Sequence, residues 1–169
     1  MRLMIVKMND MEIGFKRLHE DARIPQKAYN DDYGFDCVAV TEEEIAPGVW
    51  RYGLGFALQI DDRMRSEWII HKIAVYPRSS IYKTGMVMSN SVGIVDESYT
   101  GEISAVFYHV KPDLPRYRVG DKICQIAVEL RPGKQAFKPV DEIRETDRGD
   151  NGYGSTGLKG MLWGDNEGW

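Results

Sequence analysis

The sequence predicts an all-β domain, and three observations support that prediction. Short apolar or alternating runs recur between turn signals, at lengths typical of strands. Glycine and proline interrupt the chain so often, for example at Pro47-Gly48 and Pro132-Gly133, that little room remains for long helices. One run, residues 122–130, alternates with a period of two, which predicts a strand with one strongly apolar face. Many short strands of this kind are typical of a sandwich, a jelly roll or a barrel.

Eight runs are predicted to form strands, and each lies between turn signals. The charged stretch 61–67 has room for at most a short helix. A length of 169 residues suits one core, so we expect a single β domain at 1–147 and a flexible C-terminal arm at 148–169. The predicted strands are residues 2–8, 12–18, 35–40, 54–60, 68–76, 86–95, 102–110 and 122–130.

The composition excludes several classes of protein. With 28% charged residues and a net charge of -4, the chain lacks the basic surplus of a duplex-binding domain, so no nucleic-acid partner is expected. No stretch approaches the apolar length of a membrane span, and the N-terminus is too interrupted for a signal peptide. We therefore expect no membrane partner and a cytoplasmic location, in the host cytoplasm if the gene is viral. Cys37 and Cys124 lie inside apolar runs, which predicts buried thiols rather than a disulfide.

The glycine-rich segment 148–157 places a cation, an aromatic ring and two hydroxyls on a nearly side-chain-free backbone. Glycines allow backbone N–H groups to approach phosphate closely, and Arg148, Ser155 and Thr156 supply further donors. Tyr153 offers a face on which a base can stack. The segment lacks the Gly-Lys-Ser/Thr ending of a Walker loop. It is interpreted either as a lid for a nucleotide or as a flexible tail.

A second candidate site lies in the segment 90–101, which is predicted to be a β-hairpin whose extended arm carries Asn90 and ends in Asp96. Backbone N–H and C=O groups in such an arm are fixed donors and acceptors. They can pair with uracil and mismatch cytosine, whose pattern is inverted. Asp96 is a candidate general base for water, and the alternative is a carboxylate that caps the turn.

Three further positions carry polar groups suited to phosphate or metal. Arg78 and the two serines after it follow an apolar run, and a guanidinium fork with neighbouring hydroxyls suits phosphate oxygens. Gln125 is polar within an apolar run; it is either a buried amide that needs partners or a residue on the solvent face of an edge strand. Asp36, near a strand start, either holds the hydration shell of Mg²⁺ or pairs with an arginine.

Five segments, in order along the chain, resemble the five motifs of the homotrimeric dUTPase (dUTP diphosphatase) family. Each motif alone is weak, but the similarity spans residues 12–157 and places the glycine-rich motif near the terminus. The resemblance implies a jelly-roll-like (β-clip) subunit, three of which assemble into a homotrimer with shared active sites. The five segments are Tyr33–Asp36, Pro77–Ser80, Asn90–Gly101, Gly120–Gln125 and Arg148–Gly157.

The resemblance also implies an activity: Mg²⁺-dependent hydrolysis of dUTP to dUMP and pyrophosphate, by attack of water on the α-phosphorus. Such an activity limits uracil in DNA and supplies dUMP for dTMP synthesis. The resemblance assigns catalytic roles to Asp96, which orients or deprotonates the water, to Tyr99, which packs on the deoxyribose, and to Gln125. The resemblance also implies that Asn90, Gly93, Ile94 and Val95 contact uracil and that Tyr153 stacks on it. It implies that Arg78, Ser79, Ser80 and Gln125 contact the phosphates, over which Arg148, Gly154, Ser155 and Thr156 close. Asp36 is implied to contact Mg²⁺-bound water.

Other classes compete with this interpretation. dCTP deaminases share the fold but use a glutamate a few residues beyond the position of Gly101. Here the stretch Ile103–Phe107 holds no carboxylate, and only Glu102 is nearby. A nucleotide-binding signalling trimer and a capsid-type jelly roll are the remaining alternatives. The presence of Asp96 favours the enzyme.

Overall fold

The computed structural model describes residues 13–60, 69–133 and 135–149. The chain divides into two units, Met1–Gln135 and Ala136–Trp169. The predicted strand at 2–8 and the short helix allowed at 61–67 lie outside the described residues. No helix in the described part of the chain is long and apolar enough to cross a membrane.

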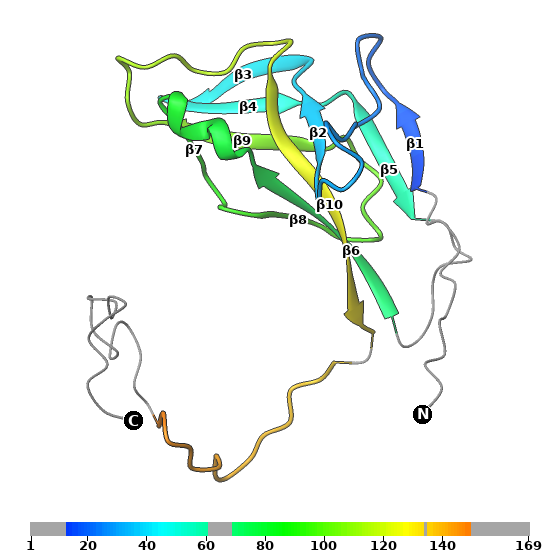
Figure 1. Ribbon diagram of the computed structural model, residues 1–169, viewed down its shortest axis with the longest axis vertical. Helices are drawn as coiled ribbons and strands as arrows, with labels where there is room; N and C mark the ends of the chain where they lie inside the picture. Colours follow the sequence, from blue (N-terminus) through cyan, green and yellow to red (C-terminus); the bar gives the residue numbers. More distant parts are fainter. Residues whose placement is uncertain (1–12, 61–68, 134, 150–169) are drawn as a thin grey trace, which may run out of the picture. The chain divides into compact units, whose positions relative to one another are not determined.

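The described part of the first unit is built from ten strands and a 3₁₀ helix, which confirms the predicted all-β fold. The strands pair into three antiparallel sheets with the orders β1-β5, β2-β10-β6-β8 and β3-β4-β9-β7 (Figure 1). The elements are β1 (Ile13–Arg17), β2 (Phe35–Val38), β3 (Thr41–Ala46), β4 (Val49–Gly53), β5 (Phe56–Ile60), β6 (Ile69–Pro77), η2 (Ser79–Lys83), β7 (Met86–Met88), β8 (Gly93–Val95), β9 (Ser104–His109) and β10 (Lys122–Pro132).

The long strand β10 is buried on both faces at its centre. It lies between β2 and β6, and its pairing with β6 runs from Cys124 opposite Pro77 to Pro132 opposite Ile69. Ile123 and Cys124 are both fully buried, as are Ile126 and Ala127, although neighbouring side chains point to opposite faces. The prediction of one apolar face was therefore wrong at the centre of this strand, because a central strand can be covered on both sides.

A core of side chains from all three sheets holds the unit together. Its largest members include Tyr52 on β4 and Phe107 on β9, both with 0% exposure. Their rings meet edge to face with centroids 5.9 Å apart, and Tyr117 packs edge to face on both. The Tyr52 hydroxyl donates to the Tyr117 carbonyl at 2.8 Å, so this buried polar atom is satisfied.

Two strands, β3 and β4, were not predicted. β3 contains three consecutive glutamates and lacks the apolar alternation by which a strand is identified from sequence. Pro47-Gly48 is the turn of this hairpin, and Gly48 adopts a φ of 73°, which favours glycine. The Gly48 N–H donates to Glu44 Oε1 at 2.8 Å, so the acidic run itself stabilises the turn.

The predicted strand 86–95 is two strands in different sheets. β7 pairs with β9, whereas β8 pairs with β6, so the chain crosses from one sheet to the other between them. Ser91, with a φ of 57°, lies at this crossing. The predicted hairpin at 90–101 was wrong for the same reason: the segment contributes one strand, β8, and then a turn in which the Tyr99 N–H donates to the Asp96 carbonyl at 2.9 Å.

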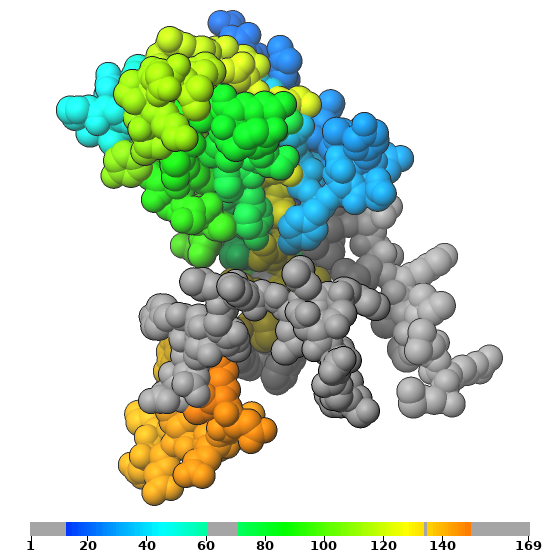
Figure 2. Space-filling model, turned by 60° about the vertical axis from the view of Figure 1, so that its left-hand side comes forward, coloured from blue at the N-terminus to red at the C-terminus, as the bar shows by residue number. Residues whose placement is uncertain are grey.

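The segment after β9 is tied to the β3–β4 hairpin through Arg116. The Arg116 guanidinium pairs with Glu42 Oε1 at 2.9 Å and stacks on the Trp50 ring, 3.4 Å from its centroid. In Figure 2 the yellow-green surface of this segment lies beside the cyan surface of the hairpin. The turn that leads into β10 is thereby anchored to the opposite sheet.

Candidate functional site

The predicted site residues in the first unit fall into two groups. One group consists of Asp36, Arg78, Ser80 and Gln125; together with Lys122, which was not predicted and pairs with Asp36, we call it the phosphate cluster. The other surrounds a cavity of about 200 Å³ beside β8, which we call the β8 cavity. No hydrogen bond or ion pair joins the two groups within the described residues. The β8 cavity is lined by Ile94, Val95, Asp96, Tyr99, Glu102, Ile103 and Ser104.

Strand pairing assembles the phosphate cluster from three parts of the sequence. Asp36 on β2 lies directly opposite Gln125 on β10. β10 also pairs with β6, whose last residue, Pro77, lies opposite Cys124. Arg78 follows Pro77 and therefore emerges next to Asp36 and Gln125. Residues far apart in sequence meet here because β10 is the common neighbour of β2 and β6.

The Arg78 side chain is fixed along one edge and open along the other. Its Nε donates to Asp36 Oδ1 at 3.0 Å, and its Nη1 lies 3.4 Å from both Ser80 Oγ and the Lys122 carbonyl. Nη2 makes no hydrogen bond within the described residues, and 29% of the side chain is exposed. A guanidinium held in this way is ready to bind phosphate oxygens.

Both oxygens of Asp36 face cations. Oδ1 accepts from Arg78 and Oδ2 accepts from Lys122 Nζ at 3.0 Å, so the arginine pairing left open by the sequence is the one observed. Among the described residues, no group of three or more His, Cys, Asp or Glu side chains is placed to hold a metal ion. Direct ligation of Mg²⁺ by this cluster therefore does not fit, and a contact through water remains a prediction.

Gln125 presents a side-chain amide without a hydrogen-bond partner among the described residues. The residue is half-buried on a central strand, which excludes the alternative of a solvent-facing edge position. Gly34 packs against it: a Cβ at position 34 would lie 2.6 Å from Gln125 Oε1 and 3.0 Å from its Cβ. The missing side chain of Gly34 thus leaves the amide room beside Asp36.

The two serines after Arg78 differ in environment. Both belong to η2, for which Arg78 is the N-cap residue. Ser79 is exposed, whereas Ser80 is half-buried with its hydroxyl at Arg78 Nη1. The structure therefore brings Ser80 into the phosphate cluster and leaves Ser79 at its rim.

Asp96 lines the β8 cavity with an unpaired carboxylate. It is exposed, and no described residue donates a hydrogen bond or forms an ion pair with it. The alternative of a turn-capping side chain is not observed, because the turn is closed by the Asp96 backbone carbonyl. A carboxylate with both oxygens available can accept a proton from water or hold a water in place.

Tyr99 forms a wall of the same cavity. Its hydroxyl donates to the Glu102 carbonyl at 3.1 Å. Its ring lies so close to Gly101 that a Cβ there would come 2.5 Å from the hydroxyl oxygen. The ring is therefore held in place while 49% of the residue stays exposed to the cavity side or to solvent.

Glu102 has a structural partner. Its Oε1 accepts the Gly55 N–H at 2.8 Å, and a Cβ at Gly53 would lie 2.5 Å from the same oxygen. This carboxylate thus fixes the end of the β4–β5 connection. That role argues against Glu102 as the mobile proton carrier of a deaminase.

The outer edge of β8 is free. β8 ends its sheet, and the backbone groups of Gly93–Val95 that point away from β6 have no hydrogen-bond partner among the described residues. Gly93 is buried against Val75, where an added Cβ would meet Val75 Cβ at 3.2 Å and Asn90 Nδ2 at 3.4 Å. Asn90 therefore lies beside Gly93, and its contact with a base remains a prediction.

The fifth segment lies mostly outside the described residues, including Tyr153, Gly154, Ser155 and Thr156. Arg148 is described, in a turn of the second unit where the Gly149 N–H donates to the Thr146 carbonyl at 3.0 Å. The contacts predicted for these residues stay predictions.

Lys122 was missed by the sequence reasoning. It is the first residue of β10, directly after Gly120-Asp121, and its charge had no evident partner until β2 and β10 were paired. A lysine directly after a Gly-Asp turn and before an apolar strand was the available signal. Its partner, Asp36, could not be inferred without the register.

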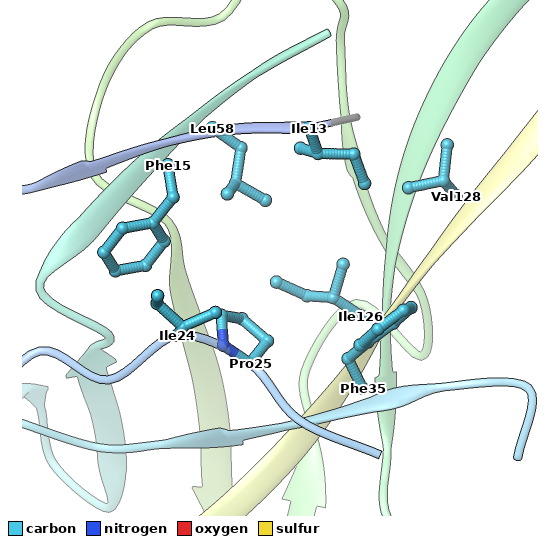
Figure 3. A pocket seen from close by; sticks show the side chains of 8 residues that line it. All are labelled: Ile13, Phe15, Ile24, Pro25, Phe35, Leu58, Ile126 and Val128. Carbon is cyan, nitrogen blue, oxygen red and sulfur yellow. The ribbon is translucent and has the colours of Figure 1, made fainter. Parts of the chain in front are cut away.

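A larger cavity of about 240 Å³ does not suit a nucleotide. Figure 3 shows apolar side chains directed into it from β1, β5, β2, β10 and the loop before β2. No charged or hydroxyl-bearing residue of the described part of the chain lines it, so a triphosphate would find no partner among these residues. The lining residues are Ile13, Phe15, Ile24, Pro25, Phe35, Leu58, Ile126 and Val128.

Comparison with known proteins gives a consistent result. The dUTPase family model matches residues 20–157. A deoxyuridine 5'-triphosphate nucleotidohydrolase of Corynebacterium glutamicum is 33% identical over 143 residues, covering 83% of this chain and 91% of the relative. One from Helicobacter pylori is 32% identical over 152 residues, covering 88% of this chain and 98% of the relative.

Solved structures share the fold. The Staphylococcus bacteriophage 80alpha dUTPase with dUPNHPP matches with a TM-score of 0.66 and 19% identity, covering 87% of this chain and 99% of that chain. A mutant dUTPase from phage phi11 of S. aureus, described with a structural Mg(II) ion, matches with a TM-score of 0.60 and 18% identity, covering 79% of this chain and 99% of that chain.

Proposed function

The chain belongs to the dUTPase family, and from this premise we propose that it is a dUTP diphosphatase that converts dUTP to dUMP and pyrophosphate. The observation that carries the proposal is Asp96: an exposed, unpaired carboxylate in a cavity bounded by an aromatic ring and a free strand edge. The relatives named above are deoxyuridine 5'-triphosphate nucleotidohydrolases, and the 80alpha structure holds a dUTP analogue.

Asp96 acts on the attacking water in this proposal. The carboxylate orients the water and accepts its proton as the new bond to the α-phosphorus forms. No described residue donates to it, which supports the role, because a carboxylate neutralised by a cation is a weaker base.

The base and the sugar are recognised at the β8 cavity. The outer edge of Gly93–Val95 supplies backbone donors and acceptors for uracil, with the Asn90 amide beside them. Cytosine presents the inverted pattern and would leave buried polar groups unpaired. The fixed ring of Tyr99 packs on the deoxyribose and leaves no room for a ribose hydroxyl.

The phosphate cluster binds the triphosphate. Arg78 and Lys122 carry two positive charges against one carboxylate, Asp36, so the cluster is cationic even though the whole chain is acidic. The open Nη2 of Arg78 and the amide of Gln125 are available to phosphate oxygens. Mg²⁺, held chiefly by the phosphates themselves, would offset their remaining charge, with Asp36 in contact through water.

We propose that the active site is completed by other copies of the chain in a homotrimer. Two features support this. The phosphate cluster and the β8 cavity share no hydrogen bond within the described residues, although one dUTP must touch both. The described part of the second unit also exposes large apolar side chains, with 106% exposure for Phe137, 66% for Val140 and 87% for Ile143. Such side chains are typical of a segment that packs on a partner.

In the cell, the activity would limit uracil in DNA and supply dUMP.

The test is pyrophosphate release from dUTP, dCTP, dTTP and UTP in turn, first with Mg²⁺ and then with EDTA. We expect turnover of dUTP alone, lost on chelation. Ammonia release from dCTP would instead identify a deaminase. Absence of turnover with dUTP still bound would contradict the proposed reaction and favour a nucleotide-binding signalling trimer.

A further inference from the structure

The two cysteines of the chain meet across the sheet. Cys37 on β2 and Cys124 on β10 are direct partners in the antiparallel register. Both are free thiols, with 1% and 0% of their surface exposed. Their being buried confirms the expectation from sequence, but the sequence alone did not predict that they are neighbours.

Their geometry suits a covalent bond. Residues directly opposite each other in antiparallel strands have Cα atoms about 4.5 to 5.5 Å apart. A disulfide spans Cα separations of about 4.4 to 6.8 Å. Because Cys37 and Cys124 are direct cross-strand partners, their side chains lie on the same face of the sheet. A direct pairing of these two strands is therefore compatible with a disulfide between the two cysteines.

We propose that Cys37 and Cys124 are an oxidisable pair that a peroxide converts into an intrachain disulfide joining β2 to β10. In the first step one sulfur attacks a peroxide oxygen, which gives a sulfenic acid and releases one water. In the second step the other thiol sulfur attacks the sulfenic sulfur, which forms the S–S bond and releases a second water. Two electrons and two thiol protons pass to one hydrogen peroxide molecule, which leaves as part of two waters.

The strand arrangement provides a route for the peroxide. β2 has four residues and is the last strand of its sheet, with a single β-bridge to Gln26 on its outer side among the described residues. β10, in contrast, is held by β6 from Cys124 to Pro132. Short edge strands open locally more readily than central ones. Opening of β2 exposes both thiols at once, and its return brings the sulfenic acid back to its partner.

The two cysteines are the sequence neighbours of two residues of the phosphate cluster. Asp36 precedes Cys37 and Gln125 follows Cys124, and these two neighbours also lie opposite each other. A disulfide here would lock together the two strands that carry them. The proposal concerns the chemistry of the thiols and holds whether or not the chain hydrolyses dUTP.

The test is a thiol count on the full-length protein, before and after hydrogen peroxide. The protein is denatured and alkylated with iodoacetamide, and its mass and non-reducing peptide map are measured. We expect two alkylated cysteines before treatment and none after it, with a Cys37–Cys124 cross-linked peptide that dithiothreitol separates. Retention of both thiols, separate sulfinic acids, or disulfide-linked dimers would each overturn the proposal.

Thermal unfolding gives an independent readout. The bond would close a loop of nearly 90 residues, and we expect the Tm of the oxidised protein to rise by at least about 5 °C. The variants Cys37→Ala and Cys124→Ala are the matched controls, because neither can form the bond. Their Tm should not rise with peroxide. An equal rise in Tm in either control would contradict the assignment of the disulfide. If a variant does not fold, the thiol count of the native sequence decides whether the disulfide forms.

Discussion

Three carboxylates near the candidate site have three different environments. Asp36 is paired with two cations, Glu102 accepts a backbone N–H, and Asp96 has no partner among the described residues. These contacts separate the roles of chemically similar side chains. The first two have protein partners, and of the three only Asp96 has both carboxylate oxygens open to an attacking water among the described residues.

Asp96→Asn is expected to slow dUTP hydrolysis by at least about a hundredfold, the low end for removal of a general base. An amide keeps the size of the side chain but cannot take a proton, so binding of a non-hydrolysable dUTP analogue should stay near normal. Single-turnover kinetics and calorimetric titration measure the two effects.

Glu102→Gln is the control for this substitution. It alters a carboxylate of the same cavity, and its amide oxygen can still accept the Gly55 N–H. We expect turnover close to that of the native sequence. A loss in Glu102→Gln with little change in Asp96→Asn would reverse the roles assigned to these two residues.

Gly34→Ala tests the position of the Gln125 amide. A methyl group at residue 34 would meet Gln125 Oε1 at 2.6 Å, so the amide must move away from the phosphate cluster. We expect kcat/KM to fall about tenfold, the equivalent of one lost hydrogen bond. The Tm should change by only a few degrees.

Gly14→Ala provides the comparison, because the nearest described atom to an added Cβ there is the Gln59 carbonyl oxygen at 3.3 Å, and no residue of the phosphate cluster is among its contacts. It should leave kcat/KM unchanged. If Gly34→Ala were fully active, the placement of Gln125 at the phosphates would be wrong.

At the scale of elements, the link between the Arg116 segment and the β3–β4 hairpin depends on Glu42. Hydrogen bonds from Arg116, and then from Arg118, lower the pKa of Glu42 below its ordinary value despite the opposing effect of burial. A carboxyl whose folded-state pKa is depressed adds stability above its unfolded pKa. That contribution is lost as the pH falls through the folded-state pKa.

Glu42→Gln should therefore reduce the free energy of unfolding at neutral pH by about 1 to 3 kcal/mol, since charged hydrogen bonds to two arginines are weakened. The deficit should shrink in acid, where the native glutamate is itself protonated. Urea unfolding at neutral and acidic pH measures both effects.

Glu43→Gln is matched to it on the same strand. Its ion pair with Arg51 is more than half exposed on both sides, and such pairs contribute little. Equal losses in the two variants would show that the Glu42 contacts do not anchor the segment.

The elements also show how far the sequence could predict the structure. Apolar periodicity located β5, β6, β9 and β10 to within about two residues, because these strands supply the core. β3 was missed because its glutamates make contacts with Gly48, Arg51 and Arg116 rather than apolar burial. The split of 86–95 into β7 and β8 was missed because a continuous apolar run does not reveal a change of sheet.

The site residues were found by a different kind of reasoning. Asp36, Arg78, Asp96 and Gln125 were first singled out by their polar chemistry, and the motif resemblance then implied their roles. The structure shows which of them meet. Lys122 and the Cys37–Cys124 pair could not be assigned, because both depend on the register between β2 and β10. Cross-strand contacts between distant segments are the information that a single sequence lacks.

At the scale of the whole molecule, the proposed homotrimer with shared active sites can be tested by mixing variants. If the phosphate cluster comes from one subunit and the β8 cavity from another, two inactive variants can complement each other. Arg78→Ala removes a phosphate contact, and Asp96→Asn removes the base. Each should be nearly inactive as a pure trimer.

Co-refolding these two variants in equal amounts should restore about a quarter of native activity. In a random trimer about half of the sites receive an intact phosphate cluster and, independently, about half receive an intact Asp96, so about a quarter of the sites have both. Pyrophosphate release from dUTP measures the recovery, and mixing the folded variants without refolding is the control. A site contained within a single chain predicts no recovery, because every chain then carries one defect. Recovery without refolding would point instead to exchange of subunits between trimers, which native mass spectrometry of a mass-labelled variant would detect.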